Sequence, residues 1–409
     1  MLFAWLLRQL VRDGDLAVRD AQGRVARFGD GSGPRVAVRI ADRATEHRLA
    51  LRPELALGEA YVDGRLILEE GSLYDLLDLV ARNYVRMRRR PAGRLLRQLE
   101  TLTRRWYQIN PVGRARRNVA HHYDLSNELY RLFLDSDMQY SCAYFEAPGE
   151  DIEAAQRAKK RHLAAKLLLR PGMRVLDIGS GWGGLALYLA EEFDVEVTGL
   201  TLSTEQLELA RERARERRLE GRVRFLLEDY RQHRGRYDRI VSVGMFEHVG
   251  VNHYDRFFEQ LAELLAPDGV AVLHSIGRMA GPGSTSPWIR KYIFPGGYVP
   301  ALSEVLPVVE RRGLWACDLE ILRLHYAHTL AAWRERFLAN RERAARLLDE
   351  RFCRMWEYYL VAAEIFFRVM DGMVFQLQLA KERDVVPITR DYMFEFEYRH
   401  RQPTAHAAE

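Results

Sequence analysis

The feature that most constrains the fold is a glycine-rich turn between an apolar strand and a helix. Residues 175–184 read VLDIGSGWGG, so glycine stands at positions 179, 181, 183 and 184. Glycine lets the backbone approach a ligand closely and adopt positive φ, while the first amides of the following helix offer unpaired donors. The segment therefore predicts a seat for a nucleotide-like cofactor. Dinucleotide oxidoreductases and S-adenosylmethionine (SAM) enzymes both carry such turns, so the turn alone does not choose between them.

The residues that follow the turn favour SAM over a dinucleotide. A dinucleotide fold places a ribose-binding acid about 20 residues past the turn, but the apolar strand at 195–203 ends without one. Thr201, Ser203 and Gln206 occupy that place instead. We expect Asp229, which follows the next apolar strand, to accept a hydrogen bond from the adenine amino group.

Strands and helices alternate through the middle of the chain. After the strand before the turn come strand 195–203, helix 204–219, strand 223–227, strand 237–244, a helix from about 252 to 265, and strand 270–274. This order predicts a parallel sheet that is covered on both faces, with ligands beyond the carboxyl ends of its strands. The segments expected at that rim are 179–184, 201–206, 228–229, 245–249 and 274–277.

The 409 residues are enough for one large domain and a smaller one. We predict a small N-terminal domain at 1–80, a candidate for membrane docking or dimerisation, and a basic helical linker at 81–120. A catalytic domain at 121–395 and a tail at 396–409 follow. Long aromatic-rich helices are expected from about 331 to 381. The stretch 356–380 carries four charged residues, so we expect an amphipathic helix packed on the protein and not a membrane span.

Charge and cysteine content limit the partners and the compartment. The net charge is +5, and residues 82–117 hold twelve arginines against the single acid Glu100. Such a stretch suits nucleic acid or anionic lipid, or else forms a solvated helix face. The chain has only three scattered cysteines, and the apolar run at 1–7 is too short for a secretory signal. These features indicate a reducing cytosol, and no metal site is predicted.

Several segments closely resemble the cyclopropane-fatty-acyl-phospholipid synthases, which are related to mycolic acid cyclopropane synthases and fatty-acyl methyltransferases. The matching segments are 58–64, 122–127, 138–145, 179–184, 201–206, 243–249, 273–277 and 387–392. One departure is Ser180, where many members have cysteine. The resemblance implies a class I SAM-dependent methyltransferase: a Rossmann-like, mostly parallel seven-stranded sheet with a small N-terminal α+β domain and added C-terminal helices.

The resemblance also implies a reaction. A methylene group derived from SAM would be transferred to the cis double bond of an unsaturated phospholipid acyl chain, through a carbocation that bound bicarbonate deprotonates. Bicarbonate would be held by Cys142, Glu247, His274, Ile276 (through its backbone) and Tyr326. The residues expected to bind SAM are Tyr140, Ser141, Asp177, Gly179, Gly181, Gly183, Thr201, Leu202, Gln206 and Asp229. Aromatic faces can stabilise a carbocation, and the candidates are Tyr140, Tyr144, Phe145, Phe246, Trp288, Tyr292, Tyr298, Tyr326 and Trp356.

Each of these residues also has a purely structural interpretation. Cys142 could be a small buried side chain, His274 a satisfied core histidine, and Tyr326 a packing residue. The pair His121–His122 could suggest a metal, but helix entry near Asp124 is the better interpretation because no third ligand stands at useful spacing.

Two alternative functions stay open at this point. A fatty-acyl methyltransferase would end in a methyl branch instead of a ring. A nucleic-acid methyltransferase or binding module would use the arginines, but amino-methylating enzymes usually carry a Pro-Pro pair after the fourth strand, and residues 245–248 read MFEH. We therefore expect no nucleic acid as partner. The expected partners are unsaturated phospholipid, the anionic inner face of the membrane, contacted peripherally from the cytoplasm, and a second copy in a homodimer.

Overall fold

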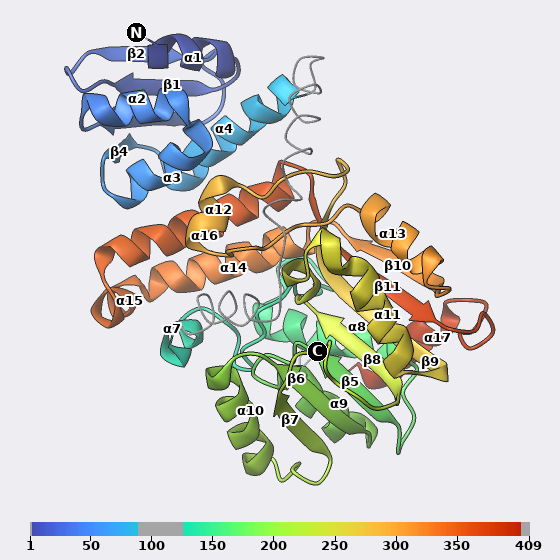
Figure 1. Cartoon of the computed structure of the whole chain (residues 1–409). Helices are drawn as coiled ribbons and strands as arrows, with labels where there is room; N and C mark the ends of the chain where they lie inside the picture. The colour runs from blue at the N-terminus through green and yellow to red at the C-terminus, as the bar shows by residue number, and fades with distance from the viewer. Residues whose placement is uncertain (1, 89–125, 402–409) are drawn as a thin grey trace, which may run out of the picture.

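The computed structural model describes residues 2–88 and 126–401, and these form two separate sheets with helices around and between them (Figure 1). The two histidines at 121–122 and most of the arginine-rich linker lie outside the described residues. The elements before that linker are α1 (Leu2–Leu10), β1 (Asp15–Arg19), β2 (Val25–Phe28), β3 (Arg35–Ile40), α2 (Arg43–Leu51), α3 (Pro53–Val62), β4 (Leu66–Glu70) and α4 (Leu73–Arg88).

The N-terminal elements form a four-stranded sheet in the order β2-β1-β3-β4. Strand β1 pairs in parallel with β3, while the other two pairings are antiparallel. Along β3 the side chains of Val36, Val38 and Ile40 are buried while Arg35 and Arg39 are exposed. This alternation follows from the two-residue repeat of a strand, so one face of the sheet meets the helices and the other meets solvent.

The described elements after the linker begin with α7 (Asn127–Arg131) and α8 (Ile152–Leu167) and continue through a long series of strands and helices. These are β5 (Arg174–Ile178), α9 (Gly184–Phe193), β6 (Glu196–Thr201), α10 (Thr204–Glu216), β7 (Val223–Leu227), β8 (Tyr237–Val243), α11 (Tyr254–Leu264), β9 (Leu265–Arg278), α12 (Pro287–Tyr292) and α13 (Leu302–Arg311). The last elements are β10 (Trp315–Leu322), α14 (His325–Ala339), α15 (Arg341–Leu347), α16 (Glu350–Arg368), β11 (Gly372–Ala380) and α17 (Asp391–His400).

The large sheet has seven strands in the order β10-β11-β9-β8-β5-β6-β7. Strands β5 to β9 pair in parallel, and β11 runs antiparallel to both of its neighbours. The prediction of a mostly parallel seven-stranded sheet is thus confirmed. Adjacent side chains of one strand enter different cores, since Val175 packs with α8, α9 and α10 whereas Leu176 packs with α11 and α13. Helices therefore cover both faces, as the alternation of strands and helices predicted.

The prediction of a helix through residue 380 is wrong. Helix α16 ends at Arg368, and Gly372–Ala380 is strand β11, inserted between β9 and β10 and buried along almost its whole length. A short apolar run that is buried on both faces carries no periodicity that separates strand from helix. The predicted pairing of Glu364 with Arg368 is present at 3.1 Å and belongs to the end of α16.

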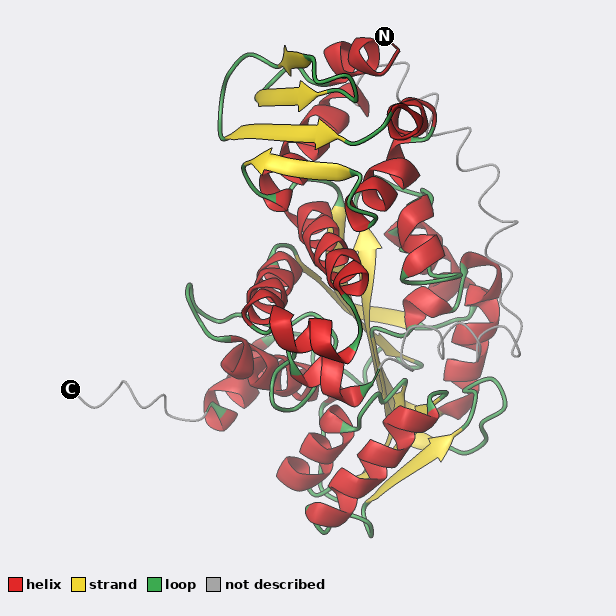
Figure 2. Ribbon diagram, turned by 90° about the vertical axis from the view of Figure 1, so that its left-hand side faces the viewer, coloured by secondary structure: helices red, strands yellow, loops and turns green. Residues whose placement is uncertain are grey.

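Helices α14 and α16 lie between the two sheets (Figures 1 and 2). Helix α16 contacts α3 and α4 of the N-terminal part, and α12 also contacts α3. At this junction Glu59 accepts hydrogen bonds from Lys291 at 2.7 Å and from Tyr292 at 2.9 Å. Across residues 2–88 and 126–401, no helix is long and apolar enough to cross a membrane.

Candidate active site

A pocket opens at the carboxyl ends of β5, β6, β7 and β8, where the sheet topology predicts a ligand. All but one of the residues predicted to bind SAM line this pocket. The lining ones are Tyr140, Ser141, Asp177, Gly179, Gly181, Thr201, Leu202, Gln206 and Asp229. The residue that does not line it is Gly183. Residues distant in sequence are thus brought to one site by the rim of the sheet and by the segment that precedes α8.

Gly183 serves the packing of α9 and does not line the pocket. It is the N-cap of that helix with φ of 82°, and a Cβ atom there would lie 2.5 Å from Cζ of Phe225 on β7. Gly181 also has positive φ, 54°, but a Cβ there would meet no atom within 4 Å. The open space above Gly181 fits the close backbone approach that a nucleoside-containing cofactor needs.

Hydrogen bonds to neighbouring side chains fix the orientation of polar side chains on the pocket rim. Thr201 Oγ1 donates to Gln206 Oε1 at 3.0 Å, which fixes both side chains at the end of β6. The Asp229 carboxylate accepts from Arg231 Nε at 2.9 Å and from Nη2 at 2.7 Å. Asp229 therefore reaches the pocket as half of an ion pair, and its predicted contact with adenine would have to share an oxygen with Arg231.

Asp177 is the buried carboxyl group at the end of β5. Burial raises the pKa of Asp177 to about 7, although the nearby charge of Lys159 partly opposes that shift. A cationic ligand in the pocket would favour its ionised form. The position of Asp177 on the lining therefore fits a sulfonium-bearing cofactor such as SAM.

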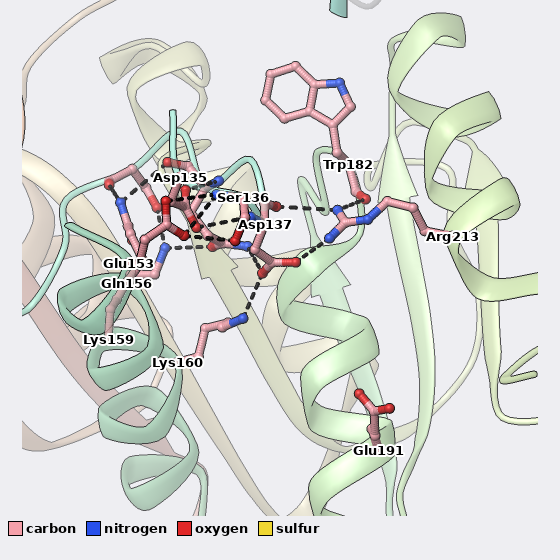
Figure 3. Close-up of polar contacts among 12 residues, drawn as sticks. Asp135, Ser136, Asp137, Glu153, Gln156, Lys159, Lys160, Trp182, Glu191 and Arg213 are labelled. Carbon is pink, nitrogen blue, oxygen red and sulfur yellow. Dashed lines mark hydrogen bonds and ion pairs between the residues drawn. The ribbon is translucent and has the colours of Figure 1, made fainter. Parts of the chain in front are cut away.

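A network from α8 holds the segment that forms another wall of the pocket (Figure 3). Lys159 Nζ donates to Gln139 Oε1 at 2.6 Å and to Ser141 Oγ at 2.8 Å. Gln156 Nε2 donates to the Ser141 carbonyl oxygen at 3.0 Å. Lys159 and Gln156 are both fully buried, so these hydrogen bonds form away from competing water. The backbone and side chain of Ser141 are thus fixed from one helix.

A second part of the same network involves Asp137, two residues before Gln139. Its carboxylate pairs with Lys160 Nζ at 2.6 Å and with Arg213 of α10. These two cations lower the pKa of Asp137 against the opposing effect of burial. Helices α8 and α10 are thereby joined through the segment that lines the pocket (Figure 3).

Sequence reasoning missed Lys159, which lies at the centre of this network. Burial lowers the pKa of Lys159 to about 8. Its charge also reaches two of the predicted catalytic residues. Burial lowers the pKa of His274 and the charge of Lys159 lowers it further, whereas at Cys142 burial raises the pKa and the charge of Lys159 partly opposes that shift. A lysine in a charged helix usually faces solvent, so the sequence held no signal for this role.

Glu247 lies just after β8 in a short 3-10 helix, Phe246–His248. Its Oε1 accepts from the backbone N–H of Ile276 at 2.6 Å. Its Oε2 is buried and has no hydrogen-bond partner among residues 2–88 and 126–401. Burial raises the pKa of Glu247 to about 7, while the Ile276 amide and the nearby Ser275 hydroxyl act in the opposite direction by smaller amounts. A buried acceptor without a donor is costly, so this oxygen fits a ligand that brings a hydroxyl group.

The other three predicted catalytic residues are also buried. His274 on β9 contacts Gln376 of β11 at 3.1 Å, and burial lowers its pKa well below the usual range. Burial raises the pKa of the Cys142 thiol, which donates to the Ala143 carbonyl at 3.3 Å. The ring of Tyr326 packs against that of Phe367 at 4.7 Å between centroids. Cys142 is therefore a neutral thiol and His274 a neutral imidazole.

None of the five predicted catalytic residues is among the described residues that line the pocket. Two of the five are next in sequence to residues that line the pocket: Cys142 follows Ser141, and Glu247 precedes His248. Ile276, whose backbone was predicted to hold an anion, directs its N–H to Glu247. Cys142 and Glu247 are thus tied to the pocket wall through their chain neighbours.

Most of the aromatic candidates gather in one core with α14 and α16, namely Tyr140, Tyr144, Phe145, Trp288, Tyr292, Tyr326 and Trp356. The other two do not. Phe246 and Tyr298 belong to the core against α11 and α13, where Phe246 stacks on Tyr254 at 4.4 Å. Phe246 follows β8 and Tyr298 follows α12, so two segments far apart in the sequence bring them to this core.

Several lining residues were not named among the predicted SAM-binding residues, although each lies in or beside a segment that the sequence analysis singled out. They are Gln139, Trp182, Glu228, Tyr230, Arg231, Met245 and His248, together with apolar neighbours. Burial lowers the pKa of His248 to about 4, so this ring is neutral in the pocket wall. Their place next to predicted residues, such as Trp182 within the glycine turn, was the signal that could have found them.

Comparisons with known proteins agree with this arrangement. The sequence profile of the family described as mycolic acid cyclopropane synthetase matches residues 112–377. The chain is 39% identical to the cyclopropane-fatty-acyl-phospholipid synthase of Escherichia coli, over 86% of this chain and 89% of that protein. It is 42% identical to a probable fatty acid methyltransferase of Pseudomonas putida, over 61% of this chain and 65% of that protein.

Solved structures show the same architecture. The cyclopropane synthase MmaA2 from Mycobacterium tuberculosis has a TM-score of 0.63 and 35% identity, covering 67% of this chain and 99% of that chain. Coclaurine N-methyltransferase, at 21% identity, has a TM-score of 0.66 and covers 80% of this chain and 99% of that one, which supports the fold alone. From the matched profile, the identity along most of its length and the cofactor pocket, the chain belongs to the cyclopropane synthase family of SAM-dependent methyltransferases.

Proposed function

We propose that this chain adds a methylene group, derived from SAM, to the cis double bond of an unsaturated phospholipid acyl chain and closes a cyclopropane ring. The observation that carries the proposal is the buried Oε2 of Glu247, which has no partner among the described residues while Oε1 is held by Ile276. The relative that matches this chain over most of its length is a cyclopropane-fatty-acyl-phospholipid synthase, which supports the same substrate class.

Bicarbonate is the ligand proposed for this site. Its hydroxyl would donate to Glu247 Oε2, and its oxyanion would accept from a neutral His274 and from the Tyr326 hydroxyl. The neutral Cys142 thiol places no negative charge beside it. The donor and acceptor pattern of these buried groups therefore fits a small anion with one hydroxyl.

When bound, SAM supplies an electrophilic methyl group and bicarbonate supplies a base. An isolated alkene offers no heteroatom proton to remove, so the protein contributes chiefly by positioning and by excluding water. Lys159 and Gln156 fix the pocket wall at Ser141, and the aromatic core around Tyr326 keeps water from the reacting carbon atoms. Partly buried rings such as Tyr140 offer faces that stabilise positive charge without attacking it.

Peripheral contact with an anionic membrane on the cytoplasmic side is part of the proposal, because the substrate is a bilayer lipid. The arginine-rich residues 82–117 support it by charge complementarity. A flotation test with anionic and neutral vesicles, run beside a DNA shift at the same salt, checks this partner. Preference for DNA with no binding to anionic vesicles would contradict it.

A methyl-branched product is the second candidate, and the 42% identity to a probable fatty acid methyltransferase is the observation that favours it. The decisive experiment incubates the protein with SAM and vesicles of an unsaturated phospholipid, then analyses the acyl chains. A cyclopropane ring and a methyl-branched alkene, formed when the carbocation loses a proton without ring closure, add the same mass, so proton NMR of the ring hydrogens must accompany mass spectrometry. A methylated product without a cyclopropane ring would refute the preferred function and support the second.

A further inference from the structure

His274 and Gln376 face each other on two neighbouring antiparallel strands of the large sheet. They are direct register partners on β9 and β11, and Gln376 Nε2 lies 3.1 Å from His274 Nδ1. Both side chains are buried, with 2% and 0% of their surface exposed. Water therefore cannot replace this contact, and the hydrogen bond fixes the imidazole ring with respect to the sheet.

The contact sets the tautomer of the ring. An amide nitrogen only donates, so Nδ1 must accept, and a neutral imidazole then carries its single proton on Nε2. The ring is neutral because burial lowers its pKa well below the usual range, and the nearby cations Lys159, Lys166 and His162 act in the same direction against Glu320.

The second ring nitrogen is left as a donor for a ligand. Among the residues that the structure describes, no hydrogen-bond partner of His274 Nε2 is present, and the bond to Gln376 is the one that the ring makes. We propose that Gln376 is a positioning residue that holds His274 as the Nε2–H tautomer, so that the ring donates a hydrogen bond to the bound anion. The identity of that anion rests on the proposed function, but the tautomer does not.

A purely structural role for a buried amide is the competing interpretation, and Gln378 supplies the comparison. It lies two residues further along β11, on the same face, and is also fully buried. Its Nε2 donates to the Lys166 carbonyl at 2.6 Å and to the Tyr392 hydroxyl at 2.8 Å. In both glutamines Oε1 is buried without a partner among the described residues. Gln378 is therefore buried on the same strand face as Gln376, but its hydrogen bonds go to Lys166 and Tyr392 and not to His274.

The experiment compares Gln376→Met with Gln378→Met in protein labelled with 15N-histidine. The two ring nitrogens of His274 are read by NMR near neutral pH, without cofactor or lipid, and the signals are assigned from their loss in His274→Asn. We expect a single Nε2–H tautomer in the unchanged protein and in Gln378→Met. In Gln376→Met, which keeps the volume but removes the donor, we expect both tautomers and a turnover lowered about 10- to 100-fold.

A proton on Nδ1 of the unchanged protein would overturn the inference, and so would an unaltered tautomer in Gln376→Met. Thermal denaturation of both variants separates loss of stability from loss of the tautomer, because both remove one buried amide. Since the NMR measurement needs no reaction, absence of a cyclopropane product would refute the proposed function alone and leave the tautomer result standing.

Discussion

Lys159 Nζ donates a hydrogen bond of 2.8 Å to Ser141 Oγ, and this bond joins helix α8 to the wall of the cofactor pocket. The same nitrogen holds Gln139 Oε1 at 2.6 Å. One fully buried cation thus orients two side chains that line the pocket. Because burial costs a lysine much of its hydration, such a residue persists where its hydrogen bonds are needed.

We expect Lys159→Met to weaken SAM binding about 10- to 100-fold, since Gln139 and Ser141 lose the donor that orients them. Isothermal titration with SAM measures the change. Lys166→Met is the matched control, because Lys166 is buried on the same helix but pairs with Glu320, away from the pocket. The control should lose stability while keeping its SAM affinity. Equal loss of affinity in both variants would assign Lys159 a merely structural role.

Glu247→Gln should fold and bind SAM normally but lose about 10²- to 10⁴-fold in turnover. The glutamine oxygen can still accept from the Ile276 amide, while the charge is lost and an NH2 donor replaces the acceptor oxygen that has no partner among the described residues. The product assay with SAM and unsaturated phospholipid gives the rate.

Glu364→Gln supplies the control for that substitution, because Glu364 is equally buried but is paired with Arg334 and Arg368. It should reduce stability and leave turnover near normal once the protein is folded. Near-normal turnover of Glu247→Gln would refute the assigned role of Glu247.

Stability should depend on pH through Glu247. The pKa of Glu247 is about 7 in the folded chain, against 4.5 for an ordinary glutamate in the unfolded chain, so the folded state binds the proton more tightly. The stabilisation of the folded state by this proton is fully present below pH 4.5 and is lost as the pH rises through about 7. Glu247→Gln cannot ionise, so its free energy of unfolding relative to the unchanged protein should rise over this range by at most about 3 kcal/mol. Urea denaturation without cofactor at several pH values measures the difference, and a constant difference would contradict the burial of an acid here.

Gly183→Ala and Gly181→Ala should separate packing from ligand binding. Both positions have positive φ, which costs a residue with a side chain about 1–2 kcal/mol. Only at Gly183 does the added methyl group also collide with Phe225. We therefore expect Gly183→Ala to lose more stability in thermal denaturation. Gly181→Ala should instead show the greater loss of SAM affinity, because its methyl group points into open space at the pocket. A reversed order would place Gly183 at the ligand.

Local patterns in the sequence were enough to predict the glycine turn, the parallel strands and the rim on which Thr201, Gln206 and Asp229 lie. These features depend on residues close in the chain, on strand periodicity and on the rule that ligands bind beyond the carboxyl ends of parallel strands. The resemblance of its motifs added the family, which the comparisons confirm.

The strand Gly372–Ala380 was predicted as helix because its apolar run is short and buried on both faces, so only its pairing with β9 and β10 identifies it. The contact of His274 with Gln376 depends on that pairing, across 102 positions of the chain. The burial of Lys159 likewise depends on how α8 packs on the sheet. The sequence by itself determined the parallel, helix-covered part of the large sheet and the cofactor seat, because both follow from local periodicity and turn chemistry. Only the tertiary structure decided which buried polar groups meet, because long-range packing sets their partners and their protonation.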